Sequence, residues 1–209
     1  MSNILVTGGS GMVGKHLKEI LPNAIYISSK DGDLKDPIYT QHLFSSYSPK
    51  TVIHLAARVG GIQENIQHPA DFFDDNILMN TNVLKFLYKN NVKNFIGVLS
   101  TCVYPDKIKK YPMTEKDMFL GPPTPTNFSY GYAKRCLAVQ IEAYNKQYGT
   151  KYNYLIPSNL YSELDNFEHG IKMHFVTSLL KKIKESNREI KLLGTGKPLR
   201  QFMYAGDFA

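Results

Sequence analysis

The stretch that decides the fold lies at the start of the chain and reads Ile4-Leu5-Val6-Thr7-Gly8-Gly9-Ser10-Gly11-Met12-Val13-Gly14. Its first four residues are apolar or β-branched and predict a buried strand, and the glycines after them predict a tight turn that opens a helix. In such a turn Gly8 permits the change of direction, Gly11 lets the backbone approach a pyrophosphate, and Gly14 allows close packing of helix on strand. Exposed amides and the helix dipole favour an anion there. The stretch therefore predicts a phosphate-binding turn.

The same alternation of short apolar runs and longer amphipathic stretches continues beyond this turn. We expect strands at residues 3–7, 24–27, 51–55, 94–100 and 152–157, and helices at 12–21, 37–47, 69–90 and 129–148. Strands that alternate with helices are typical of βαβ units and a parallel sheet. The sequence therefore predicts an α/β fold with a doubly wound parallel sheet, the Rossmann fold.

The pattern changes after Pro157. Residues 158–170 lack a clear period and predict a loop, residues 172–186 predict a helix, and residues 190–193 predict a short strand. A further strand begins close to the end of the chain, where a natural domain rarely stops. We therefore expect residues 1–160 to form a dinucleotide-binding domain and residues 161–209 to form an incomplete, C-terminally truncated substrate-binding domain.

Composition excludes several classes of protein. The chain has 209 residues with 43% hydrophobic residues, which is too apolar for disorder, and its two cysteines are too few for a disulfide framework. It shows neither a signal peptide nor about 18 consecutive apolar residues, so we expect a cytoplasmic protein with no membrane partner. The net charge of +7 is spread along the chain without interleaved aromatic residues. This pattern favours an anionic small ligand over nucleic acid.

The end of the second predicted strand bears on the choice of dinucleotide. Ser28, Ser29 and Lys30 offer hydroxyls and a cation, which suit the 2′-phosphate of NADP, whereas a carboxylate there suits the ribose diol of NAD. Asp31 and Asp33 follow closely, so NAD remains an alternative. The local chemistry favours NADP.

Tyr130 and Lys134 lie one turn apart on a predicted helix, so their side chains share a face. An ammonium beside a phenol favours the phenolate, which lowers the pKa of the tyrosine towards the range useful for proton transfer. Tyr26 and Lys30 have the same spacing but lie at a strand end. Ser100 ends the fourth predicted strand, at the sheet edge where ligands bind. These three residues predict a site that protonates a carbonyl oxygen.

The glycine-rich turn, Ser100 and the Tyr130-x-x-x-Lys134 motif resemble the extended short-chain dehydrogenase/reductase superfamily. Other segments resemble the GDP-L-fucose synthase family within this superfamily. These segments are residues 56–62, Ser100-Thr101-Cys102-Val103-Tyr104-Pro105, residues 125–127, 157–161 and 165–167, and Arg200-x-Phe202. The resemblance covers essentially the whole chain. It implies an NADPH-dependent, homodimeric enzyme, paired through helices 69–90 and 129–148. It also implies epimerisation of GDP-4-keto-6-deoxy-D-mannose at C3 and C5 and reduction at C4 to give GDP-L-fucose.

The same resemblance implies roles for individual residues. Cys102 is the base and His174 the acid of epimerisation, Tyr130 protonates the keto oxygen with Ser100 as its partner, and Lys134 binds the nicotinamide ribose. The cofactor residues implied are Thr7, Gly8, Ser10, Gly11, Met12, Val13, Gly14, Ser29, Lys30, Leu55, Ala56, Ala57, Tyr130, Lys134, Pro157, Asn159, Leu160 and His174. Asn159, Lys182 and Arg200 are implied to bind substrate, and no metal ligand is implied.

The residues also allow plainer interpretations. Cys102 is compatible with a small buried apolar residue, and His174 with a helix cap. Thr177 stands at a usual proline position of the family and Lys182 at a usual arginine position, where it lacks the bidentate fork. A related NAD-dependent nucleotide-sugar epimerase or 4,6-dehydratase is one alternative, although Thr101-Cys102 departs from the Thr-Asp or Thr-Glu pair of dehydratases. An inactive homologue that binds only the dinucleotide is the other.

Overall fold

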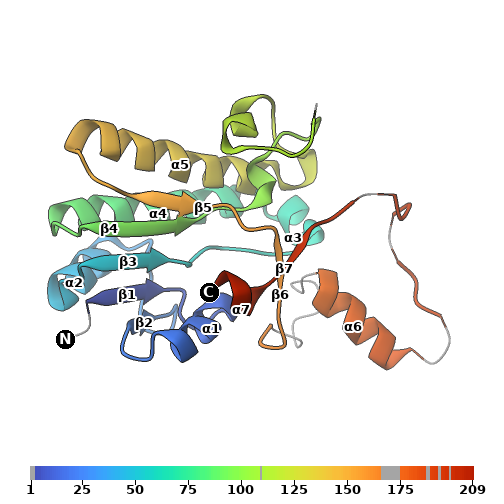
Figure 1. The fold of residues 1–209 in the computed structure, drawn as a ribbon, viewed down its shortest axis with the longest axis horizontal. Coiled ribbons are helices and arrows are strands. Elements are labelled where there is room, and N and C mark those ends of the chain that lie inside the picture. Colours follow the sequence, from blue (N-terminus) through green and yellow to red (C-terminus); the bar gives the residue numbers. More distant parts are fainter. Residues whose placement is uncertain (1–2, 109, 166–174, 187–188, 193, 198) are drawn as a thin grey trace.

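A five-stranded parallel sheet forms the centre of the protein in the computed structural model, which describes residues 3–108, 110–165, 175–186, 189–192, 194–197 and 199–209 (Figure 1). Its strands are β1 (Ile4–Thr7), β2 (Ile25–Ile27), β3 (Thr51–His54), β4 (Asn94–Val98) and β5 (Asn153–Leu155). They lie in the order β2-β1-β3-β4-β5, and every neighbouring pair is parallel. All five strands fall within the ranges that the sequence predicts.

Helices cover both faces of this sheet. The helices of the first part of the chain are α1 (Met12–Ile20), α2 (Pro37–Tyr47), α3 (Ile62–Gln67), α4 (Pro69–Lys89) and α5 (Phe128–Tyr148). The crossover from β1 to β2 runs towards one edge, whereas the later crossovers run towards the other. Right-handed crossovers therefore place α1 on one face and α2, α4 and α5 on the opposite face. Helix α4 packs against both α2 and α5. The predicted doubly wound Rossmann fold is confirmed.

The hydrophobic core lies between the sheet and the α2, α4 and α5 layer. Leu5, Val52 and Phe95 from the strands pack in one buried cluster with side chains of these helices, such as Leu87 of α4 and Leu137 of α5. Each such side chain contributes about 1.5–3 kcal/mol on burial. This packing fixes the carboxyl ends of β1, β3 and β4 beside one another.

A second, two-stranded parallel sheet follows, made of β6 (Asn159–Tyr161) and β7 (Phe202–Tyr204), with α6 (Phe175–Glu185) between them in sequence and α7 (Ala205–Phe208) after them. The predicted loop over residues 158–170 is therefore wrong at β6. The predicted strand at 190–193 is also wrong over its described residues, because 190–192 form no strand and are exposed. A pattern of three residues carries too little period to reveal a strand whose partner lies far along the chain.

Contacts with α1 hold this second unit in place. His16 and Ser162 share a buried hydrogen bond of 2.7 Å, and Lys15 donates to the carbonyl of Leu164. Helix α7 also packs against α1. These contacts bring β6 and β7 to the carboxyl edge of the main sheet, over the start of α1. Across the described ranges, none of the helices combines the length and the apolar character that a bilayer crossing requires.

Candidate active site

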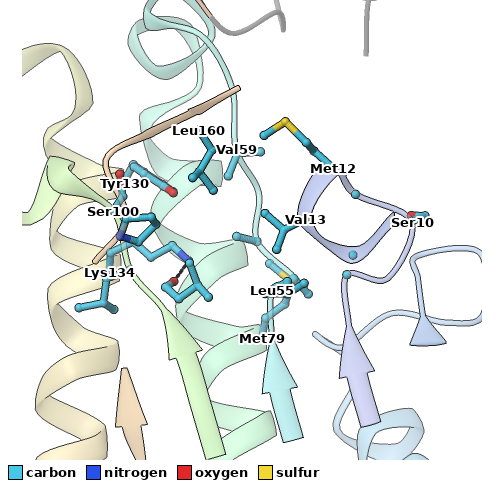
Figure 2. Close-up of a pocket in the computed structure, with 18 of the residues that line it drawn as sticks. Ser10, Met12, Val13, Leu55, Val59, Met79, Ser100, Tyr130, Lys134 and Leu160 are labelled. Atoms are coloured by element: carbon cyan, nitrogen blue, oxygen red, sulfur yellow. Dashed lines mark hydrogen bonds between the residues drawn. The ribbon is translucent and has the colours of Figure 1, made fainter. Parts of the chain in front are cut away.

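A cavity of about 490 Å³ lies at the carboxyl ends of the parallel strands. Figure 2 shows Ser10, Met12 and Val13 of the glycine-rich turn on one side, and Ser100, Tyr130 and Lys134 on the other. Leu160 of β6 and Phe202 of β7 also line it. The cavity spans the point between β1 and β3 where the order of connections reverses, and ligands of doubly wound sheets bind at this point.

The glycine-rich turn forms the floor of one half of the cavity. Gly8 has a φ of +73°, and a Cβ there would lie 2.7 Å from the backbone nitrogen of Ala56. At Gly14 a Cβ would lie 2.7 Å from the Cα of Gly9, so α1 packs closely on the turn. No side chain caps the start of α1 at Gly11. Its amides and dipole therefore face the cavity, and this cradle fits the pyrophosphate of a dinucleotide.

The end of β2 forms the outer wall next to this turn. Ser28 donates both its backbone N–H and its hydroxyl to the Asp31 carboxylate, each at 2.8 Å, and these bonds lower the pKa of Asp31. Ser29 is exposed and lines the cavity, as does Asp33. Lys30 is exposed and lies outside the lining, which differs from the predicted set. The hydroxyl of Ser29 is thus the predicted cofactor group that this wall presents.

Tyr130 and Lys134 project from α5 towards the end of β4, where Ser100 lies (Figure 2). Lys134 is 3% exposed, and its Nζ donates to the carbonyl of Val98 at 2.7 Å. Burial lowers the pKa of this lysine to about 8. Its Nζ is 5.9 Å from the centre of the Tyr130 ring. The predicted grouping of tyrosine, lysine and serine at one edge of the sheet is present in the structure.

The electrostatics of Tyr130 differ from the sequence-based expectation. Burial raises the pKa of this phenol far above its ordinary value, a charge on Cys102 raises it further, and the hydrogen bond with Ser100 lowers it. The expected lowering of its pKa by Lys134 is therefore wrong, because desolvation of the phenolate dominates. Tyr130 is held as a neutral phenol, which is a proton donor.

Gly131 is a site residue that the sequence-based reasoning missed. A Cβ at this position would lie 2.6 Å from the carbonyl oxygen of Cys102 and 2.9 Å from Cβ of Pro123. The absent side chain thus lets α5 approach the 3₁₀ turn Thr101–Val103 that follows β4. A glycine directly after the motif tyrosine was the available signal, since glycine in a helix interior costs about 1 kcal/mol and calls for a packing reason.

Cys102 lies two residues beyond Ser100 but outside the lining of the cavity. Its backbone N–H donates to Oγ of Ser100 at 3.3 Å, and Nδ2 of Asn127 donates to its Sγ at 2.8 Å. Burial raises the pKa of the Cys102 thiol, whereas the bonds from Ser100 and Asn127 and the charge of Arg200 lower it. The net effect is a raised pKa, so the thiol is the favoured form, and the contacts with Ser100 and Asn127 reduce the cost of ionising it.

The other predicted residues fall into three sets. Leu55, Ala56, Ala57, Pro157, Asn159 and Leu160 line the cavity as expected. Lys182 and Arg200 are exposed and lie outside the lining. Nζ of Lys182 donates to the carbonyl of Lys191, and Nη1 of Arg200 donates to the carbonyl of Leu199. His174 lies outside the described residues. Lining residues that the sequence did not suggest include Val59, Met79, Phe175, Val176 and Phe202.

Thr7 lies beneath the cavity instead of in its wall. It is fully buried, and its hydroxyl shares a 2.7 Å hydrogen bond with Nδ1 of His54. Nε2 of His54 pairs with Oδ1 of Asn80 at 3.0 Å, and burial lowers the pKa of this histidine to about 4. The strand that precedes the glycine-rich turn is thus tied to β3 and α4 by a buried polar chain.

Comparison with known proteins identifies the family that this chain resembles. Residues 4–209 match the family described as NAD dependent epimerase/dehydratase family. The chain belongs to the NAD dependent epimerase/dehydratase family. Within this family it is similar to GDP-L-fucose synthase of Dictyostelium discoideum, with 41% identity over 99% of this chain and 67% of the relative. It is also similar to GDP-L-fucose synthase of Escherichia coli (strain K12), with 32% identity over 99% of this chain and 66% of the relative.

A solved structure shows the same fold. The GDP-L-fucose synthetase from Naegleria fowleri, crystallised with NADP, superposes with a TM-score of 0.86 at 39% identity, over 99% of this chain and 70% of that one. The chain therefore spans about two thirds of the length of these family members.

Proposed function

We propose that this protein takes part in GDP-L-fucose synthesis as an NADPH-dependent epimerase and reductase, which converts GDP-4-keto-6-deoxy-D-mannose into GDP-L-fucose. One observation carries the proposal: a single cavity joins the glycine-rich turn to Ser100, Tyr130 and Lys134, with the thiol of Cys102 next to it. The similarity to GDP-L-fucose synthases in several organisms supports the same reaction.

The cavity offers polar groups for a dinucleotide along its length. The amides at the start of α1 hold the pyrophosphate, Ser29 meets the 2′-phosphate, and Lys134 meets the nicotinamide ribose. Bound NADPH supplies the hydride for reduction at C4. The Naegleria fowleri relative was crystallised bound to NADP, which supports this choice over NAD.

The protein groups manage the protons of the reaction. Tyr130, neutral because of its burial, donates its phenolic proton towards the C4 keto oxygen, and Ser100 hydrogen-bonds the same oxygen. The thiolate of Cys102 removes the proton from C3 or C5, and both carbons are acidic because each is bonded directly to the C4 carbonyl carbon. We assign the opposing acid to His174, in keeping with the ordinary titration range of histidine.

The remaining parts of the proposal concern partners and location. Residues 161–209 contribute to the substrate-binding domain, in which the cations of Lys182 and Arg200, together with Asn159, meet the nucleotide-sugar diphosphate. Two copies pair through α4 and α5, whose outer faces expose Leu78, Tyr88 and Val139. The free thiols of Cys102 and Cys136 favour a reducing compartment, the cytoplasm.

A direct assay tests the function. The protein is incubated with NADPH and GDP-4-keto-6-deoxy-D-mannose in D₂O, and both NADPH oxidation and deuterium at C3 and C5 of the sugar are followed. We expect both signals, loss of oxidation in Tyr130→Phe, and loss of deuterium incorporation in Cys102→Ser. NADPH binding without either signal would reject the enzyme in favour of an inactive dinucleotide-binding homologue. Oxidation without deuterium incorporation would indicate a C4 reductase that does not epimerise.

A further inference from the structure

We propose that Asn127 is the positioning residue of the epimerisation base: its side-chain amide donates to Sγ of Cys102, orients the sulfur and stabilises the thiolate that forms when Cys102 acts as the base. This inference rests on the proposed function, because it gives Cys102 the role of base. It adds a residue that the family motifs quoted above do not assign to the chemistry.

The contact joins two turns that are distant in sequence. Asn127 ends the 3₁₀ turn Pro125–Asn127 before α5, and Cys102 lies in the turn Thr101–Val103 after β4. Nδ2 of Asn127 is 2.8 Å from Sγ of Cys102 in a partly buried setting. An amide N–H directed at sulfur supplies a donor, and a thiolate is an acceptor without a proton of its own. A donor in this orientation stabilises the thiolate more than the thiol, because the thiolate is the stronger acceptor.

Asn127 gives up a common stabilising role to make this contact. It occupies the N-cap position of α5, where asparagine is among the preferred residues because its side chain accepts from the first turn of the helix. Such a cap is worth about 1 kcal/mol, yet the side chain of Asn127 makes no cap hydrogen bond. The side chain turns to the thiol instead, so its placement serves the sulfur and not the helix.

The carbonyl end of the same side chain shows a second cost. Oδ1 of Asn127 is buried and accepts no hydrogen bond from the described residues. A buried acceptor without a donor is unfavourable for the fold. The side chain keeps this orientation, with Nδ2 on the sulfur.

The surroundings of Cys102 explain why a donor is needed. Burial raises the pKa of this thiol and so disfavours the thiolate. The groups that lower the pKa are the hydrogen bonds from Ser100 and Asn127, and the positive charge of Arg200. Arg200 is exposed and acts through its charge, whereas the amide of Asn127 touches the sulfur. Ser100 gives the largest offset to the burial and Asn127 the next, so the amide of Asn127 adds a second side-chain hydrogen bond that favours the thiolate.

The chemical step balances without any change in Asn127. The thiolate takes the proton from C3 or C5, so an S–H bond forms and the C–H bond breaks. The electron pair of that C–H bond moves into the enolate, whose oxygen is hydrogen-bonded by Tyr130. The thiol of Cys102 afterwards returns to thiolate by losing its proton to solvent. Asn127 stays neutral and keeps the sulfur aimed at the sugar.

Alkylation of the thiol tests the proposal without any substrate. In a Cys136→Ser background, Cys102 is the only cysteine, and its rate of reaction with iodoacetamide is measured from pH 6 to pH 10. Asn127→Asp keeps the size of the side chain and its capping ability but puts a carboxylate on the sulfur. We expect it to move the apparent pKa of the thiol up by about one unit or more. Asn127→Ser, which also caps helices, should move it in the same direction by less.

The matched control is Asn94→Asp. Asn94 is exposed at the start of β4, at the opposite end of that strand from the site, and the substitution makes the same change of charge. We expect its alkylation profile to equal that of the parent. Identical profiles for parent, Asn127→Asp and Asn94→Asp would overturn the proposal, as would equal shifts in both aspartate variants.

Deuterium exchange at C3 and C5 then connects the thiol to the reaction. For Asn127→Asp we expect about tenfold slower exchange at pH 7, unchanged affinity for NADPH, and recovery of the exchange rate at higher pH. A loss that high pH does not restore would assign Asn127 a purely structural role and overturn the proposal. If the parent itself shows no exchange while the alkylation shift is present, the proposed function fails and the thiol–amide contact stands.

Discussion

Lys134 is the buried cation whose cost to the fold is most directly measurable. It is 3% exposed, and its ammonium donates to the carbonyl of Val98 at 2.7 Å. Burial lowers the pKa of this lysine from 10.5 to about 8. The folded protein thus binds the proton of Lys134 more weakly than the unfolded chain does, so the charged form of this residue destabilises the fold.

The size and sign of the effect follow from these two values. The difference between the pKa values of the folded and unfolded states corresponds to about 3 kcal/mol. Below pH 8 both states hold the proton, and stability does not depend on this group. Between pH 8 and 10.5 the unfolded chain holds more protons, so stability rises with pH. The gain is complete above pH 10.5.

Urea unfolding of the parent and of Lys134→Met at pH 7 and pH 9.5 measures this contribution. Groups that are not coupled to Lys134 titrate alike in both proteins, so the difference between their pH profiles reports the lysine together with its charge coupling to Cys102 and His54. We expect the parent to gain about 2 kcal/mol of unfolding free energy relative to Lys134→Met between the two pH values. Lys146→Met on the same helix is the control, since Lys146 is exposed, and its profile should follow the parent. Parallel profiles for parent and Lys134→Met would refute the reasoning.

Three further predictions concern positions around the cavity. Gly131→Ala places a Cβ 2.6 Å from the carbonyl oxygen of Cys102 and must displace α5. We expect kcat, measured by steady-state kinetics, to fall at least about tenfold, and the affinity for NADPH, measured by titration, to stay within about threefold. An unchanged kcat would contradict this prediction. Ser29→Asp puts a negative charge on the cavity wall, and we expect about tenfold weaker binding of NADPH with little change for NADH; equal losses for both would exclude a 2′-phosphate at this wall. His54 has a pKa of about 4 when folded and 6.5 when unfolded, so its contribution to stability is complete above pH 6.5 and is lost as the pH falls towards 4. Between pH 7 and pH 5 the free energy of unfolding of the parent, measured with urea, should fall by about 2 kcal/mol relative to that of His54→Gln. The control is His42→Gln, which should follow the parent because His42 is exposed. Equal losses in all three proteins would disprove the prediction.

The main sheet was predictable because its signals are local. The apolar run before Gly8 and the glycines after it specify a strand and a turn within a few residues, and β2 and β3 are likewise short runs that precede a helical period. The spacing of Tyr130 and Lys134 likewise places both on one face of α5. Local pattern was therefore sufficient for the fold and for the grouping of these residues.

Features that depend on distant contacts were not predictable in the same way. Strand β6 exists because Asn159 pairs in register with Phe202, and no local period reveals that partner. The pKa of Tyr130 depends on how deeply α5 buries it, which the four-residue spacing does not contain. The turn of Asn127 towards Cys102 is of the same kind, because the two residues lie 25 positions apart in the chain.

The pairing of β6 with β7 has a consequence for how the chain opens and closes. Holding Asn159–Tyr161 against Phe202–Tyr204 closes a loop of roughly 40 residues, whose entropy cost is about 3 kcal/mol before any constant term. The hydrogen bonds among six paired residues offset little of this entropy cost. The pairing therefore depends on contacts outside it, such as the hydrogen bond between His16 and Ser162. A ligand that contacts both Leu160 and Phe202 adds a further contact that stabilises the pairing of β6 with β7. Amide hydrogens of β7 should therefore exchange with solvent more slowly as the cavity fills, well before those of β1 respond.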